Sequence, residues 1–147
     1  MMKSPSGDAY WGKTKLAKTD DAMAAIELPD ADLADLAELL YAQTGASDAD
    51  AAKAAHGAKL FDKACNDCHS IGEGVLGQSA PALFGVGSRD YYTSFIGNPK
   101  SPMHMRNDNS EMPRFDKELS IADRDALAAY LVWLRTATQQ DVDTMER

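Results

Sequence analysis

The stretch from residue 70 to residue 119 constrains the fold most, because it is long and carries few helix or strand signals. It holds 6 of the 10 glycines and 4 of the 6 prolines, and only Asp90–Ile96 has a helical pattern. Loops longer than about 12 to 15 residues are uncommon in compact domains unless they are functional. We therefore expect a large apolar cofactor to supply the interior that this stretch does not build for itself.

Helical periodicity dominates the rest of the chain, and no convincing strand pattern is present. Three segments place apolar residues at three- and four-residue spacing; they run approximately over residues 30–43, 47–66 and 120–137. Ser47 or Asp48 is expected to cap the second of these helices. Ser120 and Asp123 form a pattern like a capping box at the start of the third. The predicted fold class is all-α.

Gly57 lies inside the second predicted helix, where glycine costs about 1 kcal/mol relative to alanine. Close packing against another helix would explain a glycine at this position. The third helix is the expected partner, because its apolar residues form one stripe, which consists of Leu127, Tyr130, Leu131 and Leu134. We predict that Tyr130 or a neighbour packs over Gly57.

The first predicted helix carries leucines on one face and takes part in a faint internal repeat. Residues 28–40 match residues 119–131 at an offset of 91, with leucine at three corresponding positions in each copy. Chance similarity between two amphipathic helices is one interpretation. The other is that residues 1–46 are the tail of a preceding domain.

The net charge of −8 is distributed unevenly along the chain. Residues 1–52 carry 4 basic and 10 acidic side chains, residues 53–117 carry 8 and 7, and residues 118–147 carry 3 and 6. Because phosphate binding requires clustered Lys and Arg, nucleic acid is not an expected partner. The acidic ends are interpreted as solvated surface.

The motif Cys65-Asn66-Asp67-Cys68-His69 has the C-x-x-C-H spacing of a c-type haem attachment site. Two thiols near the end of one helix can each add to a vinyl group of the porphyrin, and the adjacent histidine can then reach the iron. A redox dithiol would need a preceding strand and a parallel sheet. A structural zinc site would need four ligands. Neither pattern is evident, so the predicted cofactor is one covalently attached haem c with its iron.

Several further motifs surround the haem motif in a fixed order: Gly57-x-x-Leu60-Phe61, Ala80-Pro81-x-Leu83, Phe95-Ile96-x-Asn98-Pro99, Met112-Pro113-x-Phe115, and Leu119-Ser120 through Leu134. Over approximately residues 52–136 the chain resembles the class I c-type cytochrome family of monohaem domains. The resemblance implies a cytochrome c fold with a loop-rich core around the haem, in which the helices of Gly57 and Tyr130 cross. We expect an N-terminal helical extension (1–46), a cytochrome c domain (47–138) and a C-terminal tail (139–147).

The resemblance also implies that Met112 binds the iron opposite His69. A thioether is neutral and soft, so His and Met ligation raises the reduction potential relative to two imidazoles. The carbonyl of Pro81 would accept a hydrogen bond from the other ring nitrogen of His69 and orient the ring. The alternative ligands to Met112 are in the same loop: Met103, His104 and Met105.

Three arginines, Arg89, Arg106 and Arg114, are candidate partners for a haem propionate. Guanidinium pairs well with carboxylate. A solvated surface position is the alternative for each of them, and the sequence does not choose among the three.

These observations predict an electron carrier, or the carrier domain of a respiratory assembly, that cycles Fe(II) and Fe(III) and is not an enzyme. Covalent haem attachment normally occurs outside the cytoplasm, so the expected location is the periplasm or the extracytoplasmic face of a membrane. Residues 1–12 lack an apolar leader segment, and the longest apolar run, Ala126–Leu134, is shorter than the roughly 20 residues of a membrane span. We expect redox proteins as partners, and membrane contact only through a partner or a removed anchor.

Two other functions remain open. If Met112 does not bind the iron, the chain is a haem enzyme or a gas-binding sensor with an open distal site. If residues 1–46 are a real repeat, the chain is one part of a diheme protein.

Overall fold

The computed structural model describes residues 3, 13, 23–104 and 112–145. These residues form helices and loops, with no β-strand among them, so the prediction of an all-α fold is confirmed. The helices are α1 (Asp30–Ala42), α2 (Ala51–Ala64), α3 (Arg89–Gly97), α4 (Ile121–Trp133) and α5 (Gln139–Met145). Helix α5 lies in the segment that was expected from the sequence to be a C-terminal tail.

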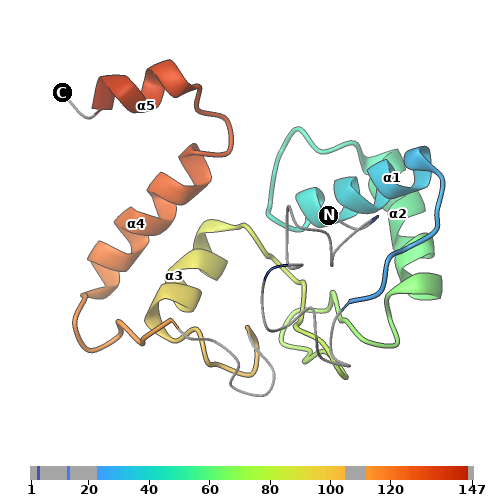
Figure 1. The fold of residues 1–147 in the computed structure, drawn as a ribbon, viewed down its shortest axis with the longest axis horizontal. Coiled ribbons are helices and arrows are strands. Elements are labelled where there is room, and N and C mark those ends of the chain that lie inside the picture. Colours follow the sequence, from blue (N-terminus) through green and yellow to red (C-terminus); the bar gives the residue numbers. More distant parts are fainter. Residues whose placement is uncertain (1–2, 4–12, 14–22, 105–111, 146–147) are drawn as a thin grey trace.

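Figure 1 shows two groups of helices joined by the long stretch between α2 and α3. Within the described residues, the helix pairs in contact are α1 with α2 and α3 with α4. Arg135, just after α4, links the two groups. Its guanidinium donates a hydrogen bond to the Gly87 carbonyl at 3.2 Å and lies over the Tyr41 ring of α1, with 5.2 Å between the guanidinium carbon and the ring centroid.

The capping residues explain where α2 and α4 begin. The Asp50 carboxylate accepts hydrogen bonds from the backbone N–H groups of Ala52 (3.0 Å) and Lys53 (3.1 Å). Donors at the N-terminus of a helix favour the charged carboxylate, and they lower the pKa of Asp50. The prediction of Ser47 or Asp48 as this cap is wrong, because Asp48 instead accepts a hydrogen bond from the Tyr41 hydroxyl at 2.7 Å.

The capping box at the start of α4 is confirmed. The Ser120 hydroxyl accepts from the backbone N–H of Asp123 at 3.2 Å, and the Asp123 carboxylate accepts from the Ser120 N–H at 3.3 Å. Two N–H groups that have no partner within the helix are satisfied in this way. This fixes the direction in which α4 leaves the preceding loop.

The α1–α2 pair contains a cluster of buried apolar side chains, formed by Leu33, Leu36, Leu39 and Phe61. Partly buried residues of the following loop pack against this cluster, among them Cys65, Ile71 and Leu83. The loop that carries the cysteine motif therefore rests on the same core as the two helices.

Gly57 lets α1 and α2 approach closely. A Cβ atom at this position would overlap the Asp35 carbonyl oxygen and lie 2.7 Å from its carbon and 3.1 Å from Cβ of Leu39. The His56 ring pairs with the Asp35 carboxylate at 2.7 Å beside this contact. The close backbone approach inferred from the glycine is therefore present.

The predicted partner of Gly57 is wrong. Tyr130 stacks on Trp133 of its own helix, with 5.6 Å between ring centroids, and α4 does not contact α2 within the described residues. Helix α1 takes that position instead. Since residues 28–40 match residues 119–131, α1 offers α2 a similar apolar stripe.

Replacing Gly57 by alanine should force α1 away from α2. We expect the free energy of unfolding to fall by about 1 to 3 kcal/mol, as at other overpacked core positions. Denaturant titration of the haem-loaded protein, followed by its helical circular dichroism, measures this loss. The control Ala55→Val adds bulk at an exposed position of the same helix and should cost less than about 1 kcal/mol. Equal losses in both variants would contradict the close contact.

Candidate haem site

One turn after α2 brings the three reactive side chains of the cysteine motif together. Cys65 is the C-cap of α2, and its N–H donates to the Phe61 carbonyl at 2.8 Å. The Cys65 carbonyl then accepts from the N–H groups of Cys68 (3.1 Å) and His69 (2.9 Å). Both thiols are free, with Cys65 half-buried and Cys68 exposed. Burial and the neighbouring Cys68 raise the pKa of the Cys65 thiol.

The loop after the motif closes on the Cys68 carbonyl. This oxygen accepts from the N–H groups of Gln78 (3.0 Å), Ser79 (3.2 Å) and Ala80 (3.1 Å). A side chain at Gly77 would overlap the Ala80 carbonyl oxygen, so glycine is required for this closure. The closed loop brings Pro81 back beside the motif.

The His69 ring is held by the backbone of Pro81. Nδ1 lies 2.8 Å from the Pro81 carbonyl oxygen. A carbonyl oxygen only accepts, so Nδ1 carries the proton and donates it, and Nε2 of the neutral ring keeps its lone pair. The next backbone bond, from Leu83 N–H to the Ser70 carbonyl at 2.7 Å, holds the two chain segments in register.

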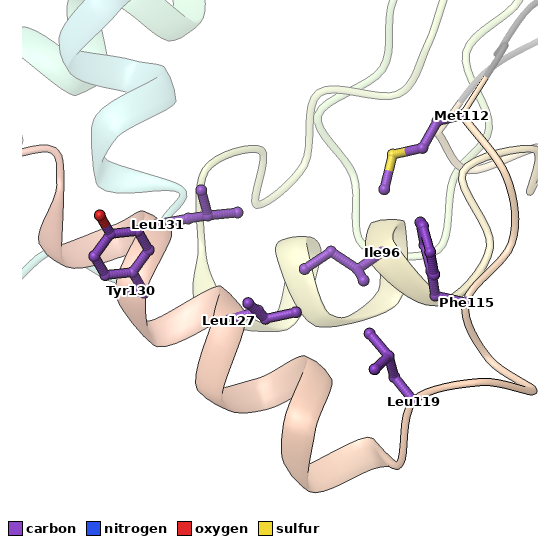
Figure 2. A pocket seen from close by; sticks show the side chains of 7 residues that line it. All are labelled: Ile96, Met112, Phe115, Leu119, Leu127, Tyr130 and Leu131. Atoms are coloured by element: carbon purple, nitrogen blue, oxygen red, sulfur yellow. The ribbon is translucent and has the colours of Figure 1, made fainter. Parts of the chain in front are cut away.

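An apolar pocket of about 410 Å³ lies against α3 and α4. Its lining residues come from α3, from the segment before α4, and from α4 itself: Ile96, Met112, Phe115, Leu119, Leu127, Tyr130 and Leu131. Figure 2 shows the Met112 thioether and the Phe115 ring at one end, and Tyr130 and Leu131 at the other. The volume falls within the range of about 300 to 1,000 Å³ found for cofactor sites.

Met112 and its described competitors lie in different surroundings. Met112 lines the pocket, whereas Met103 is not among the lining residues. His104 is buried, and its Nε2 is 3.0 Å from the Ser94 hydroxyl, which leaves this nitrogen engaged. Met105 lies outside the described residues, as does Arg106.

The two described candidates for a propionate partner both bind carboxylates of the protein. Arg89 pairs with Asp125 through two hydrogen bonds, one of them 2.6 Å from Nε to Oδ1, and so ties α3 to α4. Arg114 pairs with Asp116. Hydrogen bonds from these arginines lower the pKa of each carboxyl group.

The described residues fit a covalently bound haem on chemical grounds. Two unpaired thiols lie within one turn of an imidazole whose Nε2 has a free lone pair. The pocket against α3 and α4, which none of these three residues lines, offers a flat ring a wall of apolar and aromatic side chains that includes the Met112 thioether. This donor set suits haem iron better than a closed zinc site, because no group of three or more His, Cys, Asp or Glu side chains in the described part of the chain could hold a metal ion.

A family model described as cytochrome c oxidase, cbb3-type, subunit III matches residues 52–131. The chain belongs to this family. The match spans α2, the cysteine motif, α3 and most of α4, so the resemblance to monohaem c-type cytochromes is confirmed. The cofactor of this cytochrome domain is covalently bound haem c with its iron. Searches of curated proteins and of solved structures found no match.

Among the described residues of this cytochrome domain, none of the helices has both the length and the apolar character needed to cross a membrane.

Several residues of the pocket wall were predicted only as parts of motifs. Ile96 and Leu119 belong to motifs that carry the family resemblance, but they were not expected at the cofactor. The sequence contained a signal for Ile96, because this apolar residue lies in the last turn of a short helix in a region that needs an apolar partner. What the sequence lacked was the pairing of α3 with α4, which places Ile96 opposite Leu127.

A polar group in the pocket should destabilise the haem-loaded cytochrome. We expect the haem to cover this pocket, so Leu131→Asn would place an amide against it without a partner, and the free energy of unfolding should fall by about 1 to 3 kcal/mol. Ile121→Asn is the control, because Ile121 is 71% exposed on the same helix and does not line the pocket. Thermal unfolding followed at the haem absorption band compares the two, and an equal loss would contradict the assignment of this wall to the haem.

Proposed function

We propose that this cytochrome domain carries single electrons within a respiratory assembly on the extracytoplasmic side of a membrane. In this proposal Cys65 and Cys68 hold the haem, and His69 and Met112 bind its iron. Electron transfer is the typical function of cytochrome c domains, and the matched family is a subunit of a cytochrome c oxidase. The observation that carries the ligand assignment is the His69–Pro81 hydrogen bond, which leaves Nε2 available to iron.

Pro81 would act on the iron through His69. A hydrogen bond to Nδ1 fixes both the tautomer and the orientation of a ligating imidazole, and it increases the basicity of the other nitrogen. Proline has no N–H of its own, and its fixed dihedral stiffens the carbonyl that accepts the bond. The closed loop over the Cys68 carbonyl keeps Pro81 in place.

Met112 would complete the ligand set from the other group of helices. When bound, the haem would supply a one-electron Fe(II)/Fe(III) couple. The Met112 thioether adds no charge to the pocket and favours the ferrous state. Phe115 and Leu119 line the same pocket as Met112, and Pro113 restricts the backbone next to the ligand.

A redox protein partner would approach the loop that carries the haem motif. Val75 and Leu76 of this loop are large apolar side chains that are about half exposed. The middle of the sequence is nearly neutral, whereas the net negative charge lies toward both ends. We propose a transient contact that is apolar at its centre and steered by the acidic ends, with an association rate that depends on ionic strength.

The domain boundaries belong to the same proposal. Residues 47–138 would form the cytochrome domain, with residues 1–46 as an extension and 139–147 as a tail. The extension is not detached, because α1 shares a buried core with α2. The likeness of residues 28–40 to residues 119–131, and the place of α1 against Gly57, support a real repeat over chance similarity.

Removing the Met112 thioether tests the ligand set and, with it, the function. The ferric protein should show the weak absorption band near the red end of the spectrum that reports methionine ligation, and the ferrous protein should bind carbon monoxide slowly. Met112→Ala should lose the band and bind carbon monoxide readily. Met103→Ala is the matched control, because Met103 lies in the neighbouring loop but does not line the pocket, and it should behave like the wild type.

The absence of methionine ligation in the wild type would point to a different function. A wild-type protein that lacks the band and binds carbon monoxide readily would contradict an electron carrier with two protein ligands. It would favour a haem enzyme or a gas-binding sensor.

A further inference from the structure

The segment that carries Met112 is fastened to the end of α3 by backbone hydrogen bonds. The Phe115 N–H is shared between the carbonyl oxygens of Ile96 (3.3 Å) and Gly97 (3.2 Å). The Asp116 N–H also donates to the Gly97 carbonyl, at 3.2 Å. We call these three bonds the α3 junction. Since each residue extends the backbone by at most about 3.6 Å, the three steps back from Phe115 keep Met112 within about 11 Å of this junction.

The α3 junction also lies beside the apolar pocket. Ile96, Phe115 and Met112 all line the pocket, and Figure 2 shows Met112 and Phe115 at the same end of it. Pro113 lies between these two residues and fixes one of the few backbone dihedrals that separate them. A displacement of the junction would therefore move the Met112 thioether relative to the pocket wall.

Arg124 of α4 packs on the α3 junction. A Cβ atom at Gly97 would overlap Nη1 of Arg124 and lie 3.2 Å from its guanidinium carbon. The guanidinium therefore rests on the bare backbone of Gly97, whose carbonyl accepts two of the junction's bonds. The Arg124 side chain is partly buried there, and its Nε is buried without a hydrogen-bond partner among the described residues.

Asp116 provides a negative charge at the same place. The hydrogen bond from Arg114 lowers the pKa of Asp116, and the positive charge of Arg124 acts in the same direction. Arg114 reaches only one of the two carboxylate oxygens. The other, Oδ1, is buried and has no hydrogen-bond partner in the part of the chain that the structure describes. Opposite charges that are partly buried are screened less than exposed ones, so Arg124 attracts this carboxylate toward α4.

We propose that Arg124 is a positioning residue, which holds the end of α3 and the Asp116 carboxylate together so that Met112 is presented to the haem iron. The proposal rests on the ligation by Met112 proposed above. Arg124 is not among the residues that line the pocket. It acts through the backbone of the segment that carries the ligand.

Gly97→Ala tests this role without removing the arginine. The new methyl group takes the place of the guanidinium, which can turn away because it is the end of a flexible side chain. Alanine also favours a helix more than glycine does, so the fold should be kept. The rate of carbon monoxide binding to the ferrous haem-loaded protein measures how often Met112 leaves the iron. At pH 7 this rate should rise by about two- to tenfold, the worth of one hydrogen bond.

Changes at Arg124 itself show whether the two residues act together. Arg124→Gln removes the charge and shortens the side chain, so it should raise the rate by a similar factor. The double variant with Gly97→Ala should bind carbon monoxide no faster than Arg124→Gln alone, because both changes remove the same contact. Arg124→Lys keeps the charge and a long apolar stem, and it should restore a rate close to that of the wild type.

Two control variants separate positioning from surface charge and from general packing of the helices. Lys117→Gln removes one positive charge next to Asp116, but from an exposed side chain. Arg89→Gln breaks the pair with Asp125, which is another tie between α3 and α4. Both controls should bind carbon monoxide at the wild-type rate and keep the methionine band. If Arg124→Gln does not fold, Gly97→Ala and the two controls carry the test.

Two results would overturn the proposal alone. One is a wild-type rate in folded Gly97→Ala or Arg124→Gln, and the other is an equal rise in either control. Rapid carbon monoxide binding by the wild type at pH 7, without the methionine band, would instead overturn the ligation by Met112 and this inference with it.

Discussion

The hydrogen bond from Nδ1 of His69 to the Pro81 carbonyl is the interaction on which the site depends. It sets the tautomer of the ring, and it holds the loop that returns from the cysteine motif. Without it, Nε2 would have no fixed direction, and the thiols of Cys65 and Cys68 would lie beside a rotating side chain. The bonds to the Cys68 carbonyl and the close packing at Gly77 keep Pro81 in reach.

The two proposed iron ligands come from different groups of helices. His69 follows α2 and belongs to the loop that packs on the α1–α2 core, whereas Met112 lines the wall formed with α3 and α4. A haem held by both would join the two groups across the interior that the glycine- and proline-rich stretch does not fill. Arg135 is one direct protein link between them. Such a haem would cover part of the apolar pocket wall, in which Leu127 and Tyr130 are 45% and 40% exposed.

The sequence predicted what depends on local chemistry. The capping box at Ser120 and the short helix beginning near Asp90 follow from nearby residues, and so does the turn that brings the cysteines to His69. Features that depend on residues distant in the sequence were harder to predict. A glycine at position 57 indicates a close neighbour but does not identify it, and two segments carry matching leucine patterns. Asp48 was a plausible cap from the sequence, but in the structure its carboxylate accepts a hydrogen bond from the Tyr41 hydroxyl, seven residues earlier. The sequence could not show that the His104 ring packs against α3, because that depends on which face of the helix the following turn meets.

The central claim is that a haem is bonded through thioethers to the two cysteines beside His69. The most direct test is the alkaline pyridine spectrum of the purified full chain, measured together with its intact mass. The account predicts one equivalent of haem c per chain, with a mass increased by one haem that remains attached after denaturation. A colourless, folded protein whose thiols are free or joined to each other would contradict it.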